Sequence, residues 1–165
     1  MKKAIGYRHQ YTSMDTNPIK QQLYDFCQTY AKDRVTRLQT QMATLQESLF
    51  SETKSSAGDK HETGRAIMQL ERERLGQQLA VAEALTQALT KVNINPLKGP
   101  IGLGSLVRTN KANYFLAISA GECHAEGGLV YCISPNTPIG GFLLGKSVGD
   151  VFVFNDKEIT VLEVR

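Results

Sequence analysis

Two long stretches with helical spacing of apolar residues, separated by a short polar interruption, constrain this chain of 165 residues more than any other feature. In the first stretch apolar residues recur in steps of three and four, apart from a step of eight between Tyr30 and Leu38, which places their side chains on one helix face: Ile19, Leu23, Phe26, Tyr30, Leu38, Met42, Leu45 and Leu49. Val35 lies off this stripe, so the seam is expected to drift there. The second stripe consists of Ile67, Leu70, Leu75, Leu79, Ala82, Leu85, Leu89 and Val92. Two narrow stripes with a short connection predict a long antiparallel α-helical hairpin, a coiled coil.

Capping and breaking residues set the expected limits of this hairpin. Residues 1–16 show no period and are predicted to be irregular. Asp15-Thr16-Asn17-Pro18 is a helix start, the first pattern stops near Phe50, and Asn93 to Pro96 ends the second. The hairpin is therefore expected over residues 17–96, with its tip near 51–64. Each helix would have about 30 residues and a length of roughly 45 Å. Such an arm places its tip far from the globular domain and buries little apolar surface.

The pattern changes at residue 97, and residues 97–165 are predicted to form a small β-rich domain. Gly99, Gly102 and Gly104 suggest a flexible link. Turn residues, Gly121 among them, then separate short runs rich in β-branched and aromatic residues: Ser105–Thr109, Tyr114–Ser119, Leu129–Ile133, Val151–Phe154 and Glu158–Val164. A short helix is expected over Pro138 to Leu144, and a tight turn at Asn155-Asp156-Lys157. The fold class is thus α+β, a helical hairpin followed by a mostly antiparallel sheet.

Composition excludes several classes of protein. The net charge of +3 gives no strong nucleic-acid footprint. No apolar run approaches the roughly 18 residues of a membrane span, and no apolar region of a signal peptide follows Lys2 and Lys3. Three scattered cysteines, Cys27, Cys123 and Cys132, fit reduced thiols in a cytoplasm better than a disulfide framework.

The strongest candidate site is at the expected tip of the hairpin. Asp59 and Glu62 are three residues apart, and on a helix this spacing puts both carboxylates on one face. An exposed pair of this kind can share a hard cation such as Mg²⁺ with other ligands. The same spacing also fits a capping box at a helix start, and Ser56 with Asp59 offers a similar cap. The two roles are compatible, because a capping carboxylate keeps free lone pairs.

Other motifs are weaker. His61 is not part of a zinc helix motif because position 65 is Arg, and Lys54, Lys60 and Arg65 are either surface charges or phosphate contacts. Gly140 to Ser147 matches the P-loop expression but lacks the surrounding βαβ unit, so we reject nucleotide binding there. Cys123, His124 and Cys132 lack the paired spacing of structural zinc ligands and are interpreted as buried or incidental.

Two separated motifs together resemble the Gre family of bacterial transcription elongation and transcript-cleavage factors. The first motif, Gly58-Asp59-Lys60-His61-Glu62-Thr63, resembles the acidic sequence at the tip of the Gre coiled coil. The second runs from Ser134-Pro135-Asn136-Thr137-Pro138-Ile139-Gly140 through Leu143-Leu144-Gly145-Lys146 to Gly149-Asp150, and resembles a segment of the Gre C-terminal domain. The order of hairpin, link and β-domain agrees over residues 17–165.

The resemblance implies an FKBP-like C-terminal domain that docks at the rim of the secondary channel of RNA polymerase. It also implies an arm that enters the channel, where Asp59 and Glu62 help to hold the polymerase's second catalytic Mg²⁺. The protein would then be no enzyme by itself, with no cofactor of its own, and it would touch nascent RNA only indirectly. Residues expected to contact the polymerase are Lys60, Arg65, Ser134, Pro135, Pro138, Gly145 and Lys146. We expect a cytoplasmic monomer without a membrane partner.

Departures from the family pattern leave alternatives open. Thr63-Gly64-Arg65 stands where the family has an Asn-Ala-acid sequence, so one charge is reversed. The chain could thus be a regulator that occupies the channel without promoting cleavage, or a helical-arm adaptor without chemistry at the tip. A prolyl isomerase is a poor fit, since such enzymes commonly floor the pocket with Trp and this chain has none. The aromatic residues that it has, including Tyr114, Phe115, Tyr131 and Phe142, are interpreted as core.

Overall fold

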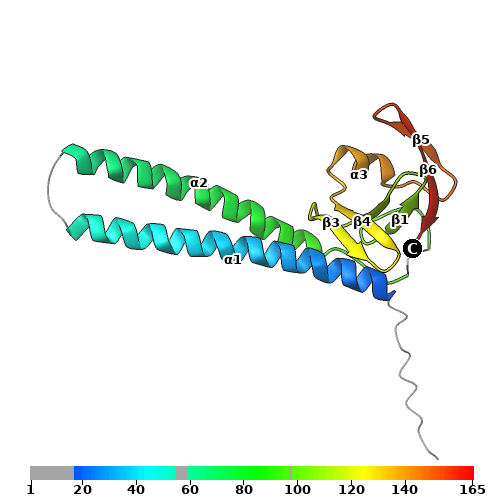
Figure 1. The fold of residues 1–165 in the computed structure, drawn as a ribbon, viewed down its shortest axis with the longest axis horizontal. Coiled ribbons are helices and arrows are strands. Elements are labelled where there is room, and N and C mark those ends of the chain that lie inside the picture. Colours follow the sequence, from blue (N-terminus) through cyan, green and yellow to red (C-terminus); the bar gives the residue numbers. More distant parts are fainter. Residues whose placement is uncertain (1–16, 55–58, 97) are drawn as a thin grey trace, which may run out of the picture.

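The structure, a computed structural model, describes residues 17–54, 59–96 and 98–165. Two long helices, α1 (Pro18–Lys54) and α2 (Asp59–Leu89), run side by side as a rod that projects from a small β-rich domain (Figure 1). The domain contains a short helix, α3 (Pro138–Leu143), and six strands: β1 (Leu106–Thr109), β2 (Asn113–Leu116), β3 (Gly121–Ala125), β4 (Gly128–Ile133), β5 (Val151–Phe154) and β6 (Lys157–Val164). This arrangement confirms the predicted α+β class.

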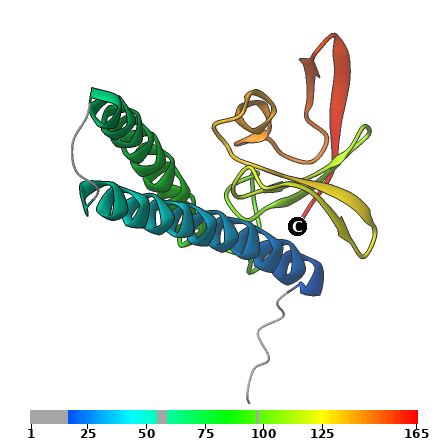
Figure 2. The same cartoon turned by 60° about the vertical axis from the view of Figure 1, so that its left-hand side comes forward.

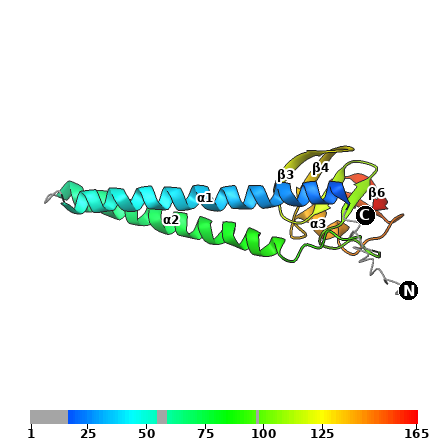
Figure 3. The same cartoon turned by 90° about the horizontal axis from the view of Figure 1, so that it is seen from below.

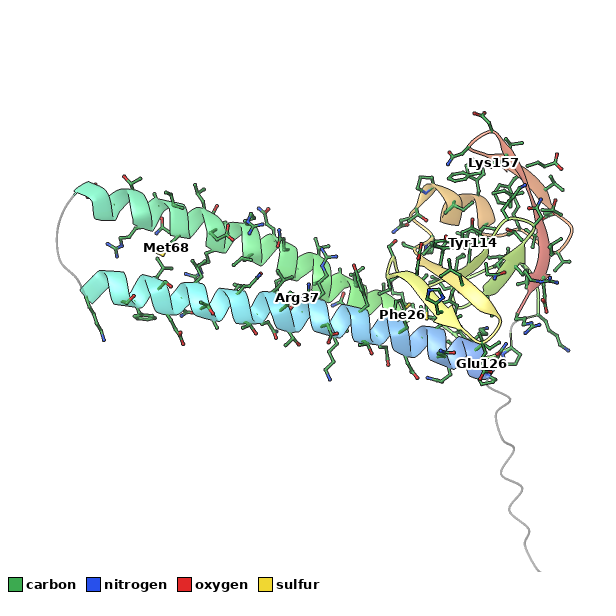
Figure 4. All side chains as sticks on the ribbon, viewed as in Figure 1. Phe26, Arg37, Met68, Tyr114, Glu126 and Lys157 are labelled. Atoms are coloured by element: carbon green, nitrogen blue, oxygen red, sulfur yellow. The ribbon has the colours of Figure 1, made fainter. Side chains whose placement is uncertain are left out.

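The face that α2 turns toward α1 follows a regular heptad, which agrees with the predicted stripe at Leu75, Ala82, Leu85 and Leu89 and departs from it nearer the tip. Its least exposed positions alternate in steps of four and three: Gly64, Met68, Glu71, Leu75, Gln78, Ala82, Leu85 and Leu89. Figure 4 places Met68 between the two helices. Ile67 and Leu70 lie beside this seam and are 62% and 67% exposed, so their assignment to the seam is wrong. Counting back from Leu75 by the heptad reaches Glu71 and Met68, which the apolar pattern did not mark.

The seam of α1 also differs from the expectation at Val35. Val35 packs with Met42 and Leu45 against a buried cluster in the middle of the arm that is formed by Leu38, Leu75 and Ala82. The seam therefore passes through Val35 rather than drifting away from it. The two helices of the arm are held together by this one narrow seam, because in a pair each helix contacts the other through a single face.

The seam assignment predicts that truncating Leu75 and truncating Ile67 have very different effects. Leu75 is 3% exposed, so Leu75→Ala should lower the free energy of unfolding by about 2–4 kcal/mol. Ile67→Ala should change it by less than about 0.5 kcal/mol, because an exposed side chain loses little and Ala favours helix. Urea unfolding followed by circular dichroism measures both. Equal losses for the two variants would contradict the seam.

The six strands form one sheet in the order β3-β4-β2-β1-β6-β5. All neighbours are antiparallel except β2 and β4, which pair in parallel, so the sheet is mixed. β3 was missed by the sequence analysis, which assigned Gly121 to a turn. The segment has one buried apolar residue, Cys123, and too weak an alternation to stand out. The predicted hairpin turn is present between β5 and β6, with positive φ at Asn155 and Asp156.

The base of the arm and one face of the sheet share a hydrophobic core. Leu23 and Cys27 of α1 and Leu89 of α2 lie in one buried cluster with Phe115 of β2 and Val130 of β4. Figures 2 and 3 show β3 and β4 beside the first turns of α1, with the distal arm extending away from the domain. The opposite face of the sheet carries a second cluster, in which Leu143 of α3 packs over the strands. Successive residues of a strand face opposite sides, so β2 supplies one residue to each core.

The glycine-rich segment after the arm is docked on the β-domain, so the expectation of a flexible link is wrong. Ile101 is buried, its N–H donates to the Lys146 carbonyl at 2.8 Å, and its carbonyl accepts from the Gly145 N–H at 2.8 Å. Gly104 donates its N–H to the Leu116 carbonyl at 2.7 Å. Gly104 has a φ of +89°, and a Cβ there would lie 1.8 Å from the carbonyl oxygen of Asn93. A glycine is needed at position 104 because the backbone of Asn93 approaches too closely for a side chain, and not because the segment must be flexible.

Gly104→Ala should therefore lower the free energy of unfolding by at least about 2 kcal/mol, through the overlap and the left-handed backbone. Gly102→Ala is the matched control, because a Cβ at Gly102 meets nothing within 4 Å. The control should stay within about 0.5 kcal/mol of wild type. Denaturant unfolding compares the two, and a harmless Gly104→Ala would show that the segment is not packed as described.

Within the described part of the chain, no helix combines the length and apolar character needed to cross a membrane.

Candidate functional site

The two long helices bring their free ends together at the far end of the arm. α1 has 37 residues and α2 has 31, which correspond to about 55 Å and 46 Å of helix. α1 ends at Lys54, beyond the limit expected near Phe50, and α2 begins at Asp59. Residues 55–58, which include the capping candidate Ser56, lie outside the described residues. The ends of α1 and α2 beside this gap lie at the opposite end of the arm from the β-domain (Figure 1).

Asp59 and Glu62 both belong to the first turn of α2, as the sequence predicted. Glu62 and Arg65 are exposed. The side chains of Asp59, Lys60 and His61 lie outside the described part of the structure. A spacing of three on a regular helix keeps positions 59 and 62 neighbours on its surface, and carboxylates are favoured near a helix N-terminus. The pairing of Asp59 and Glu62 as cation ligands stays a prediction.

A third acid, Glu71, stands at a seam position two turns further along α2. Its carboxylate is held by its own helix, since Arg74 Nε donates to Glu71 Oε2 at 2.8 Å. The hydrogen bond from Arg74 lowers the pKa of the Glu71 carboxyl. Glu71 therefore keeps its charge at the edge of the seam, where it is turned toward Arg74 rather than toward the tip.

The second predicted site, Ser134 to Lys146, belongs to the β-domain and does not meet the tip. Thr137 caps α3: its hydroxyl accepts from the Gly140 N–H at 3.2 Å and donates to the Ser134 carbonyl at 2.7 Å. Pro138 follows as the first residue of the helix and is exposed, while Ser134 and Pro135 are half-buried. The motif thus encodes a tight turn into a short helix, and its prolines remain on the surface.

This local geometry predicts that Thr137→Val destabilises the domain although its shape is almost unchanged. Both hydroxyl hydrogen bonds are lost, which should lower the free energy of unfolding by about 1–2 kcal/mol. Thr137→Ser keeps the hydroxyl and should recover most of that loss. Thermal or denaturant unfolding measures the difference, and equal stability of the Val and Ser variants would argue against the cap.

Next to this turn, Phe142 is partly exposed and contacts the rings of two residues of β5, although it was interpreted from the sequence as core. Phe142 is 47% exposed, and its ring stacks on Phe152 with centroids 5.7 Å apart and meets Phe154 edge-on at 5.9 Å. Lys146 Nζ lies 5.8 Å from the Phe152 ring centroid. The interpretation of Phe142 as core is therefore wrong, because α3 covers the sheet with Leu143 and leaves Phe142 at its edge. A helical repeat over residues 138–144 could have shown that neighbours 142 and 143 diverge.

The remaining motifs are also placed by the structure. In the P-loop-like sequence, Gly140 lies inside α3 and Gly145 has a φ of +80°, so a helix precedes Lys146 and the strand β5 follows it. This is the reverse of the order a P-loop requires. Cys123 is buried whereas its neighbour His124 is exposed on the other side of β3. Among the side chains that the structure describes, no group of three or more His, Cys, Asp or Glu residues could hold a metal ion.

Comparison with known proteins gives little support beyond these observations. No protein-family model and no curated protein matches the chain. A solved structure, that of the transcription factor Gfh1, matches 79% of this chain and 92% of its own, with 23% sequence identity and a TM-score of 0.32. At this TM-score the likeness carries no weight for fold or function. The functional conclusion therefore depends on the tip, the arm and the two sequence motifs.

Proposed function

We propose that this protein is a cytoplasmic bacterial transcription elongation factor that binds RNA polymerase and inserts its arm into the secondary channel. At the active centre, Asp59 and Glu62 would help to hold the second catalytic Mg²⁺ during cleavage of backtracked RNA. The protein then has no catalytic activity alone and no cofactor of its own. The resemblance of the tip and Ser134–Lys146 motifs to the Gre family motivates this proposal.

The position of Glu62 is the single observation that carries the proposal. Glu62 is exposed on the first turn of α2, at the end of an arm only two helices wide. A helix with its side chains is about 10–12 Å across, so the rod is roughly twice that in width and about 50 Å long. A carboxylate on such a rod can reach the bottom of a deep, narrow channel that would exclude a globular domain.

The chemistry of the two acids suits this role. Mg²⁺ prefers oxygen ligands in an octahedral shell and is often held by one or two carboxylates with water and phosphate oxygens completing the shell. A second ion in phosphoryl transfer stabilises the attacking oxygen. In our proposal Asp59 and Glu62 supply two oxygen ligands and leave the other positions to water and the polymerase. Lys60 and Arg65 would offset the phosphate charge of the RNA.

The β-domain would supply the docking contacts at the mouth of the channel. Pro138 and Gly145 are exposed, and Ser134, Pro135 and Lys146 are half-buried on the same segment around α3. These residues lie on the rigid turn set by Thr137 rather than on the arm. Docking and tip chemistry would therefore be separable by mutation.

A second candidate function is occupation of the channel without cleavage. Arg65 is exposed one turn after Glu62, where the family carries an acid, and Gly64 sits at the seam between them. A cation there would weaken the hold of the tip on Mg²⁺ by simple repulsion. A factor of this kind would compete for the channel and inhibit rather than rescue backtracked complexes.

The direct test is RNA cleavage in stalled, backtracked elongation complexes of bacterial RNA polymerase. Saturating wild-type protein should shorten the RNA, and Asp59→Asn or Glu62→Gln should reduce the cleavage rate by at least about tenfold, since each removes a charged ligand. Glu73→Gln is the matched control, because Glu73 is exposed on the same helix but further from the tip. Its rate should equal that of wild type.

Binding to the polymerase, measured in parallel, separates the alternatives. Unchanged RNA lengths with bound wild-type protein would refute the cleavage role and favour channel occupation. Absence of binding would refute both and favour an adaptor with another partner. Binding that survives all tip variants but fails when Pro138 and Lys146 are replaced would support docking through the β-domain.

A further inference from the structure

All three cysteines of the chain converge where the arm joins the sheet. Cys27 lies on α1, far in sequence from Cys123 on β3 and Cys132 on β4. Their exposures are 0%, 5% and 1%, and all three thiols are free. They belong to the same buried cluster that fixes the base of the arm on the domain. An odd number of cysteines gave no hint of this arrangement in the sequence.

We propose that Cys27 and Cys132 form a redox-sensitive latch, in which a disulfide bond between them locks the arm onto the β-domain. The two thiols come from different parts of the fold and hydrogen-bond each other, with Cys27 also accepting from the Ile118 backbone. A bond between them therefore joins α1 directly to β4. The inference does not depend on what the arm binds.

The pairing is selective for Cys132 over Cys123. In the register of β3 and β4, Cys123 lies opposite Val130 and Cys132 lies opposite Gly121, so the two strand cysteines are diagonal rather than directly paired. Cys27 is the sulfur to which Cys132 is hydrogen-bonded. A disulfide bond needs the two Cα atoms within about 7 Å of each other. The shared buried cluster is what brings Cys27 and Cys132 into the same neighbourhood.

The pKa values of the two thiols shift in opposite directions. The Cys132 thiol and the Ile118 N–H stabilise a thiolate at Cys27, and lower its pKa despite burial. The hydrogen bond with Cys27, followed by burial, raises the pKa of Cys132. In the proposed reaction we take Cys27 as the attacking thiolate and Cys132 as the resolving thiol, and exchanging the two roles would give the same disulfide.

The reaction requires a two-electron oxidant, for which hydrogen peroxide is the simplest. The Cys27 thiolate attacks one peroxide oxygen, the O–O bond breaks, and Cys27 becomes a sulfenic acid as hydroxide leaves and is protonated to water. The Cys132 sulfur then attacks the sulfenic sulfur, the S–O bond breaks, and the second water carries away the Cys132 proton. In total two thiols and one peroxide give one disulfide and two waters.

Because both sulfurs are buried, formation of the disulfide bond requires motion of the arm as well as an oxidant. Neither sulfur is reachable while α1 lies on the sheet, so the oxidant enters only during transient opening of the arm–domain interface. Reclosure then brings Cys132 onto the oxidised Cys27. The oxidised protein would be held in the arrangement seen here.

The test uses the full chain treated with hydrogen peroxide under native conditions, followed by alkylation and peptide mapping. Trypsin releases Cys27 within residues 21–32, and cleavage after Glu122 and Glu126 separates Cys123 from Cys132. We expect the intact mass to fall by two hydrogen atoms and a linked peptide to contain Cys27 and Cys132. The unfolding temperature should rise by about 5–10 °C and return to its original value with dithiothreitol.

Variants supply matched controls. Cys123→Ser should still form the disulfide, whereas Cys27→Ser and Cys132→Ser should not. A linkage through Cys123, oxidation of one cysteine to a sulfinic acid, or thiols that stay fully reduced in the wild-type protein would each overturn the proposal. Because these outcomes are read on the wild-type chain, a variant that fails to fold does not affect the conclusion.

Discussion

The structure depends on one shared hydrophobic core at the base of the arm. Leu23 and Cys27 of α1, Leu89 of α2 and Phe115 of β2 are buried together, so neither the hairpin nor the sheet is complete without the other. Two helices joined by a single seam bury too little apolar surface to set their own direction. The β-domain provides the missing contact and thereby fixes the line along which the arm points. In the docked segment, Gly104 lies against the backbone of Asn93 just after α2, while Ile101 belongs to the core on the opposite face of the sheet.

The distal arm is built differently from its base, and this difference bears on function. Beyond the cluster of Leu38, Leu75 and Ala82, the seam of α2 consists of Glu71, Met68 and Gly64. These residues give weak apolar contact, so the last turns are held mainly by the continuity of two long helices. A rod that is well packed at its base and lightly packed at its end is compatible with the proposed entry of the arm into a channel. The acids at the start of α2 are carried on that end.

Much of the fold could be predicted from the sequence, because long helices and β-branched runs leave strong periodic signals. The hairpin, α3 and the turn at Asn155 and Asp156 were predictable in this way. The seam of α2 was predictable from Leu75 to Leu89 but not toward the tip, where it passes through Gly64 and Glu71 while Ile67 and Leu70 beside it stay exposed. β3 was missed because Gly121 suggested a turn. The docking of the glycine-rich segment was missed because glycine is common both in flexible segments and where two backbones pack closely. The tip acids were found by spacing, whereas the convergence of the cysteines required the tertiary structure.

The shared core should give the arm one fixed direction relative to the β-domain. Spin labels at Arg65→Cys, near the tip, and Lys111→Cys, in the exposed turn between β1 and β2, measure this directly by pulsed electron paramagnetic resonance. The native thiols are buried, so an unlabelled wild-type control shows whether they stay unreactive. We expect a single narrow distance distribution that matches the extended arm. A broad distribution reaching short distances would show an arm that swings or folds back, and would contradict the account.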